Sequence, residues 1–194
     1  QELEKSWQSV YFDLIEKAHE FQSLTESTKA SSAMRTGIYM THVKKDNDEL
    51  SFKLLRCSSN FSGPSCNFAD TDNEVIDKVN EMSNLYFSNP AGLNHVLAQI
   101  YKNRVETVEN KKGTVVKQRK AKIKAHSDKT KDMPENAIMA FTTFYNFDSV
   151  KSKLNHKEFD ICYGKSSVLT RLHFRLKKQV TDQSYVKEFS VTLY

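Results

Sequence analysis

The segment KAKIKAHSDKTKDMPENAIMAFTTFY, residues 120–145, combines the pattern of two strands with a motif that could bind a metal ion. Toward the end of the stretch from Thr114 to His126, small or apolar residues alternate with basic ones, which is the period of a half-buried strand. The stretch from Ala137 to Tyr145 is rich in apolar and aromatic residues. We therefore predict a strand that ends at His126-Ser127-Asp128, a polar loop that contains Pro134, and a second strand.

The motif would bring an imidazole and a carboxylate to one side of the chain. His126 and Asp128 are two residues apart, and side chains with this spacing in an extended segment point to the same face. With a distant second histidine they would form the facial triad that binds non-haem Fe(II) and leaves coordination positions open. The structural alternative is that His126 and Asp128 form a hydrogen-bonded surface pair without a metal ion.

The first 92 residues predict two helices and a hairpin, because apolar residues recur there at spacings of three and four or lie in short extended runs. The expected elements are a helix over 4–21, strands over 36–43 and 50–57 joined by the turn KKDNDE, and a helix that starts with a capping box at Thr71 and Glu74 and ends near Asn89-Pro90. The apolar stripe of the second helix consists of Val75, Ile76, Val79, Met82, Leu85 and Tyr86.

The second half of the chain predicts mainly strands. Residues 93–101 fit either a helix or a buried strand, and Gly113 is suited to a turn. Further strands are expected over 168–178 and 187–194, where β-branched and aromatic residues are frequent. Because helices come first and antiparallel strands follow, we predict an α+β fold in which the sheet closes on itself as a jelly roll.

The order of these features resembles the double-stranded β-helix of the Fe(II)/2-oxoglutarate-dependent oxygenases, especially the AlkB-like branch. In that branch an apolar segment ending in Tyr, here 96–101, precedes the His-x-Asp strand, and a loop with Pro leads to a regular apolar strand. The resemblance covers residues 93–194 and is firmest over 126–145. It implies one oxygenase-like domain over 1–194, in which N-terminal helices and the hairpin of 1–92 pack on a jelly-roll core over 93–194 that is incomplete at its C-terminal end.

The resemblance also implies a set of site residues. His126 and Asp128 would be iron ligands and catalytic residues, and Tyr101 would donate a hydrogen bond to 2-oxoglutarate, although Gln99 stands where the family usually has Asn. The third ligand would be His173, His156 or a histidine after Tyr194. Arg171 and Arg175 share one strand face with His173 and could bind the far carboxylate of 2-oxoglutarate.

The implied function is that of a dioxygenase that uses Fe(II), 2-oxoglutarate and O₂ to hydroxylate or demethylate an unidentified substrate. Between Lys111 and Lys131 the chain has nine Lys or Arg and a single Asp, which is either a solvated hairpin or a surface for a polyanion such as nucleic acid. The polyanion-binding residues would be Lys117, Arg119, Lys120, Lys122 and Lys124. The alternative function is a non-catalytic basic β-rich module, a degenerate relative, that binds nucleic acid or a protein partner through this hairpin.

Composition and cysteine number bear on domain number, membrane association and cellular compartment. The chain of 194 residues has the size of one domain, a net charge of +5 and three cysteines, too few for a disulfide scaffold. Apolar runs are shorter than the roughly 20 residues that cross a bilayer, so we expect no membrane span. The low number of cysteines makes a reducing, intracellular compartment, cytoplasmic or nuclear, the expected setting. Secretion stays open, because Cys57 and Cys66 could be bridged in an exported chain. The sequence lacks a Gly-rich phosphate loop, a nucleophile elbow and paired-Cys zinc spacing.

Overall fold

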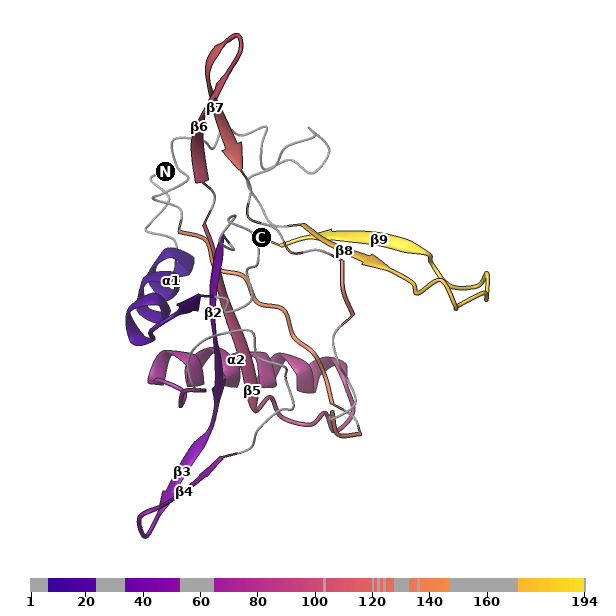
Figure 1. The fold of residues 1–194 in the computed structure, drawn as a ribbon. Helices are drawn as coiled ribbons and strands as arrows, with labels where there is room; N and C mark the ends of the chain where they lie inside the picture. Colours follow the sequence, from indigo (N-terminus) through magenta and orange to yellow (C-terminus); the bar gives the residue numbers. More distant parts are fainter. Residues whose placement is uncertain are drawn as a thin grey trace, which may run out of the picture. The chain divides into compact units, whose positions relative to one another are not determined.

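The computed structural model describes residues 7–23, 34–52, 65–102, 104–119, 121, 123, 125–127, 133–135, 137–146 and 171–193. The chain divides into two compact units, one of residues 1–13 with 140–194 and one of residues 14–139. Within the described ranges the fold is mixed α+β, with two helices and small antiparallel sheets (Figure 1). The predicted α+β class is confirmed. The described strands form separate small sheets, so closure into a jelly roll and the single-domain organisation stay predictions.

The main sheet of the unit 14–139 has the order β1, β2, β5, and all its neighbours are antiparallel. Its strands are β1 (Gln22–Ser23), β2 (Arg35–Thr41) and β5 (His95–Tyr101), with β2 and β5 paired from Arg35↔Tyr101 to Thr41↔His95. Ile38, Met40 and Ile100 are buried there and form most of the described apolar core. The ambiguous segment 93–101 is therefore a strand.

The predicted hairpin forms with different strands from those expected. β2 pairs with β5, whereas the hairpin consists of β3 (Val43–Asp46) and β4 (Glu49–Phe52). Its turn is only Asn47-Asp48, with positive φ angles of 46° and 68°. Two successive left-handed residues give the turn whose twist matches that of paired strands, and Asn and Asp tolerate this conformation. The charged residues on either side of the turn can therefore lie in the strands.

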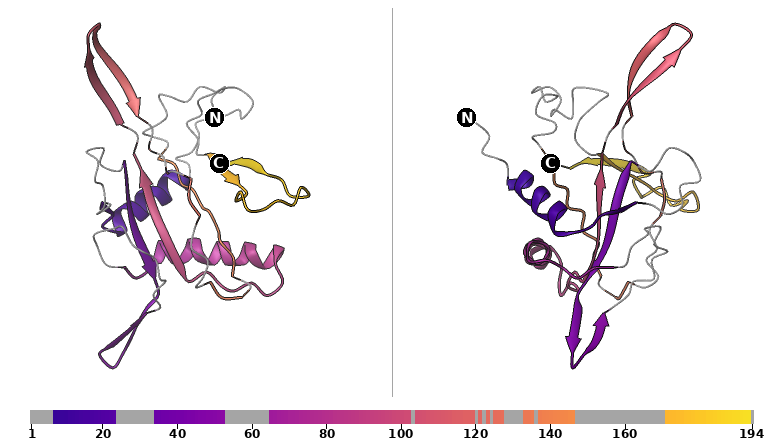
Figure 2. Two further views of the ribbon diagram at one scale, coloured as in Figure 1. Left: turned by 45° about the vertical axis from the view of Figure 1, so that its right-hand side comes forward. Right: turned by 60° about the vertical axis from the view of Figure 1, so that its left-hand side comes forward.

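The helices are α1 (Trp7–Ala18) and α2 (Asp70–Tyr86), close to the two that the apolar periodicity predicts. The predicted capping box at Thr71 and Glu74 is wrong. The N-cap is Ala69, two residues earlier, and the Asp72 carboxylate accepts a hydrogen bond from the backbone N–H of Ala69 at 2.8 Å. In Figure 2, α2 lies on one side of the strands β2 and β5. Ile76 is buried, and Asn80 Oδ1 accepts a hydrogen bond from the N–H of Leu93.

A second hairpin consists of β6 (Arg104–Asn110) and β7 (Gly113–Arg119), joined by Lys111-Lys112. Gly113 has a φ of 115°, a conformation that side chains with a Cβ rarely adopt, which confirms it as a turn residue. The predicted strand over 114–126 is confirmed only as far as Arg119, where β7 ends opposite Arg104. Of the residues after it, those that the structure describes (121, 123 and 125–127) are outside any strand.

The unit of residues 1–13 and 140–194 contains the antiparallel strands β8 (Arg171–Arg175) and β9 (Glu188–Thr192), which confirm two predicted strands. The ring of Phe174 stacks on Phe189 at 4.8 Å and meets Phe141 edge-on at 6.4 Å. The predicted strand over 137–145 is wrong, since these residues are not in a ladder. They pack by side chains instead: Phe144 stacks on Tyr11 of α1, and the Tyr145 hydroxyl donates to the carbonyl of Leu193.

Candidate functional site

The iron-binding motif lies after the end of β7. The described residues Ala125, His126 and Ser127 are exposed and outside any strand. Asp128, the second predicted ligand, lies outside the described residues. The predicted strand geometry that would align the two side chains is absent at His126 itself. A shared face for the pair therefore stays a prediction.

The candidate third ligand His173 lies in the middle of β8. Exposure alternates along this strand, with Arg171, His173 and Arg175 exposed and the residues between them half-buried. The prediction that these three side chains share one face is thus confirmed. Arg175 is already engaged, because its Nε and Nη2 atoms donate to Glu188 Oε2 on β9 at 3.1 and 3.0 Å. The other candidate ligand, His156, lies outside the described residues.

Tyr101, the predicted contact to 2-oxoglutarate, is the last residue of β5 and is 43% exposed. Its hydroxyl donates a hydrogen bond to Gln99 Oε1 at 2.5 Å. Residues two apart on a strand share a face, so this pairing follows directly from the strand assignment. Gln99 therefore acts as a local partner that orients the phenol.

The residues described do not include three His, Cys, Asp or Glu side chains grouped so that they could hold a metal ion. His126 belongs to the unit 14–139 and His173 to the other unit. Two of the four residues considered for the triad, Asp128 and His156, are outside the described ranges. The complete triad therefore remains an expectation from the sequence.

The basic residues predicted to bind a polyanion are only partly described. Lys117 and Arg119 are on β7, whereas Lys120, Lys122 and Lys124 lie outside the described residues. At the tip of the hairpin, Lys111 and Lys112 are exposed, and the backbone N–H of Lys112 donates to Asn110 Oδ1. The tip thus presents two adjacent cationic side chains to solvent.

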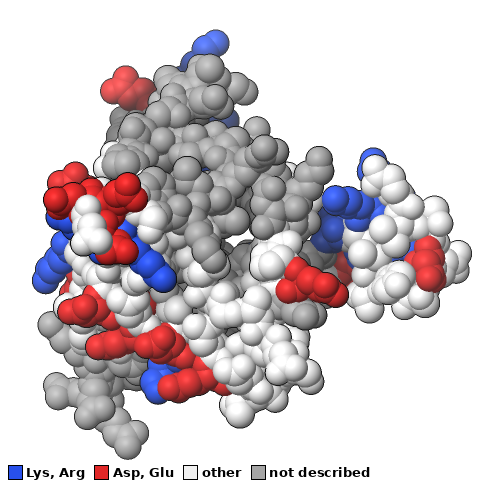
Figure 3. All heavy atoms as spheres, turned by 90° about the horizontal axis from the view of Figure 1, so that it is seen from below, with Lys and Arg blue, Asp and Glu red and all other residues white. Residues whose placement is uncertain are grey.

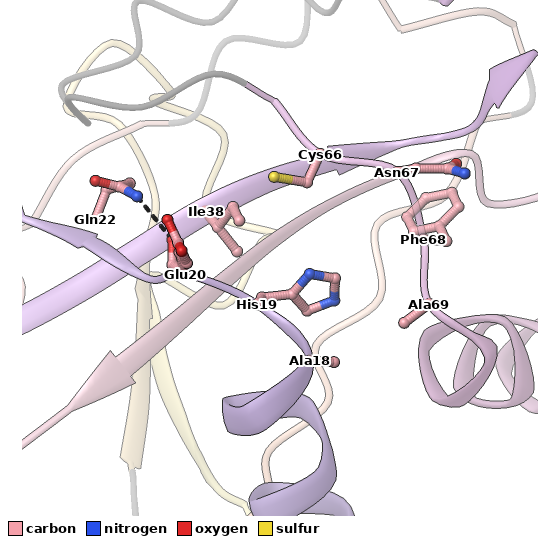
Figure 4. Close-up of a pocket in the computed structure, with 9 residues that line it drawn as sticks. All are labelled: Ala18, His19, Glu20, Gln22, Ile38, Cys66, Asn67, Phe68 and Ala69. Carbon is pink, nitrogen blue, oxygen red and sulfur yellow. Dashed lines mark hydrogen bonds between the residues drawn. The ribbon is translucent and has the colours of Figure 1, made fainter.

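A hollow of about 390 Å³ lies between the end of α1, strand β2 and the segment that leads into α2 (Figure 4). Its lining residues are Ala18, His19, Glu20, Gln22, Ile38, Cys66, Asn67, Phe68 and Ala69. Cys66 is held beside β2 by two backbone hydrogen bonds, from Thr41 N to Cys66 O and from Cys66 N to Tyr39 O. The hollow is therefore walled by segments that are distant in sequence.

One lining residue, His19, forms a buried polar pair that sequence reasoning missed. His19 Nε2 and Asp72 Oδ2 are 2.6 Å apart, and their side chains are only 5% and 4% exposed. The carboxylate of Asp72 also accepts the N–H of Ala69. An acidic residue in the first turn of α2 was the available signal, but its partner is 53 residues away. The pair links the end of α1 to the start of α2, which is primarily a structural role.

No family model, curated protein or solved structure matches the chain. In the part of the chain that the structure describes, neither helix is both long and apolar enough to cross a membrane.

Proposed function

We propose that this chain is the iron-binding part of a non-haem Fe(II)/2-oxoglutarate-dependent dioxygenase that hydroxylates or demethylates an as yet unidentified substrate. The motif His126-Ser127-Asp128 carries the proposal, because an imidazole and a carboxylate two residues apart are two of the three donors of the facial triad. The finer fold proposed with it is a jelly-roll core to which β8 and β9 belong.

The side-chain types of His126 and Asp128 suit non-haem iron, because imidazole and carboxylate groups both bind Fe(II). His126 and Asp128 would hold the ion, and the third ligand would be a second histidine, for which this chain offers His173 and His156. When bound, Fe(II) with 2-oxoglutarate and O₂ would supply the oxidation of a C–H bond, with succinate and CO₂ as the by-products. The role of the protein is to set the ligand geometry, orient the co-substrate and limit the access of water.

Two other side chains would orient 2-oxoglutarate in this proposal. The Tyr101 hydroxyl could exchange its bond to Gln99 for one to the co-substrate. Arg171 is the better of the two arginines for the far carboxylate, since Arg175 already donates two hydrogen bonds to Glu188. The proposal therefore assigns Arg171 the carboxylate and Arg175 a role in positioning β8 against β9.

A turnover assay tests the proposal. We expect succinate to form from 2-oxoglutarate only when Fe(II) is present, and His126→Ala to abolish this reaction. His42→Ala is the matched control, because His42 is also exposed in the same unit but has no carboxylate two residues on. Equal succinate formation by the wild type and His126→Ala would refute the proposal.

A second candidate function is a basic binding module without catalysis, and the exposed Lys111 and Lys112 at the β6–β7 tip favour it. Neutralised phosphates release counterions, so such a module should bind nucleic acid with a steep salt dependence. His126→Ala would leave that binding unchanged. Salt-sensitive binding of a single-stranded oligonucleotide without succinate formation would thus favour the module over the oxygenase.

A further inference from the structure

The C-terminal end of α2 exposes a group of large apolar side chains. Met82, Leu85, Tyr86 and Phe87, here called the α2 ridge, are exposed by 56%, 79%, 76% and 54%. The first three are spaced by three and four residues and so lie on one face of the helix. Single exposed apolar residues are ordinary on protein surfaces, but a contiguous group of this kind marks an interaction site.

The helical periodicity explains why this ridge is unusual. The predicted apolar stripe of α2 includes Ile76 at its start and Met82, Leu85 and Tyr86 at its end. Ile76 is buried and Val75 and Val79 are half-buried, whereas Met82, Leu85 and Tyr86 are exposed, and the buried residue of the last turns is Ser83. The fold therefore covers the apolar stripe only over its first half. Its second half retains the apolar surface that a partner would remove from water.

Acidic side chains flank the α2 ridge. The helix has five carboxylates, those of Asp70, Asp72, Glu74, Asp77 and Glu81, and a single Lys, Lys78. Asp72 is buried against His19, and Asp77 and Glu81 are the two carboxylates nearest the ridge. Lys78 Nζ is 2.8 Å from Glu81 Oε2, and this exposed ion pair leaves Asp77 as excess negative charge beside it. Figure 3 shows carboxylates gathered along this side of the molecule next to uncharged surface. Because the surface beside the α2 ridge is acidic, it favours a cationic partner over anionic lipid headgroups or nucleic acid.

A surface of complementary character lies on the hairpin β6–β7. At the tip, Lys111 and Lys112 are exposed, and Val115 and Val116 on β7 are 41% and 65% exposed. We call residues 110–116 the β6–β7 tip. It combines cations with exposed β-branched side chains, whereas the α2 ridge combines carboxylates with exposed apolar ones. Both halves of a complementary contact are therefore present on the same chain.

We propose that the α2 ridge of one copy of this chain binds the β6–β7 tip of a second copy. The two surfaces are different, so the contact is head-to-tail and can repeat along a row of molecules or close into a ring. The apolar side chains supply the burial, and Asp77 and Glu81 of one copy face Lys111 and Lys112 of the next. This inference is independent of the iron site, so either one can fail without the other.

Sedimentation velocity over a range of protein concentrations tests the contact. We expect the average mass to rise above the 22.4 kDa of one chain with concentration and to fall again in 1 M salt, where charges are screened within about 3 Å. Leu85→Ser should weaken the association about tenfold, as loss of a central apolar contact does. Val186→Ser, which changes a side chain 70% exposed in the other unit, is the matched control and should have no effect.

A charge exchange makes the test specific. The variant Asp77→Lys with Glu81→Lys and the variant Lys111→Glu with Lys112→Glu should each be monomeric, because each places like charges on both surfaces. A mixture of the two variants should associate again, because every ridge then meets a tip of opposite charge in the other variant. Circular dichroism of each variant establishes that it is folded. A wild-type chain that stays monomeric at all concentrations, or a mixture that fails to associate, would overturn the proposal.

Discussion

The pair of His19 and Asp72 is a short, buried polar contact between segments that are 53 residues apart in the unit 14–139. Its two side chains are almost fully excluded from water, and the carboxylate also serves the start of α2. A carboxylate with two donors at a helix N-terminus is stabilised both by those hydrogen bonds and by the helix dipole. The pair therefore joins the start of α2 to the residue that follows α1.

Replacing this carboxylate should destabilise the protein. Asp72→Asn removes the charge that His19 and the Ala69 N–H both contact, and we expect a loss of about 1–3 kcal/mol in the free energy of unfolding. Urea denaturation followed by circular dichroism measures it. Asp70→Asn is the control, because Asp70 is exposed in the same helical turn and its change should stay within about 0.5 kcal/mol. Equal effects of the two changes would contradict the structural role of the pair.

Single residues were predictable from the sequence only where the signal was local. The shared face of Arg171, His173 and Arg175 follows from the period of a strand, and Gly113 was identified as a turn residue from its position in ENKKGT. The contact between His19 and Asp72 was not predictable, because it depends on how α1 and α2 meet. For the proposed iron site the signal is only partly local: His126 and Asp128 are two residues apart, whereas the third proposed ligand is distant in the sequence.

At the scale of elements, the hairpin β3–β4 shows how turn chemistry selects strand partners. The prediction paired the strand around 36–43 with one around 50–57, whereas the chain uses Asn47-Asp48 as a two-residue turn and leaves β2 to β5. A short turn of two left-handed residues fixes the register of the strands beside it. The interruption at His42, between β2 and β3, could not be read from the apolar pattern.

Changes in this turn should alter stability in opposite directions. Asp48→Gly should stabilise the hairpin by up to about 1 kcal/mol, because Gly adopts positive φ without a steric penalty and Asn-Gly is the preferred pair. Asn47→Val should destabilise it by about 1–2 kcal/mol, because a β-branched residue is disfavoured in the left-handed region. Thermal unfolding of both variants measures the difference. A destabilising Asp48→Gly would show that the turn has another geometry in solution.

The segment after β7 shows the limit of alternation as a strand signal. Small and basic residues alternate before His126, yet the ladder of β6 and β7 stops at Arg119. A period of two shows only that a segment could be half-buried in a sheet, and a strand also needs a neighbour for its backbone. Likewise, Phe141 and Phe144 contribute aromatic contacts from a segment without a ladder. Side-chain packing and backbone pairing between strands are therefore different requirements, and the same sequence pattern can reflect either one.

At the scale of the whole molecule, the class of fold was predictable and the arrangement was not. The order of helices before strands indicated an α+β protein, and two helices and most of the expected strands are present. Which strands pair depends on contacts between distant residues, as β2 and β5 show with partners about 60 positions apart. The net charge of +5 likewise conceals an acidic α2 and a basic β6–β7 hairpin, and this asymmetry underlies the proposed association between copies.

The most direct test of the central claim is an anaerobic titration of the protein with Fe(II) in the presence of 2-oxoglutarate, followed by calorimetry. We expect one bound iron per chain, with binding that depends on 2-oxoglutarate and is lost in both His126→Ala and Asp128→Ala but kept in His42→Ala. Iron binding of equal strength in His126→Ala and in the wild type, or no binding by the wild type, would contradict it.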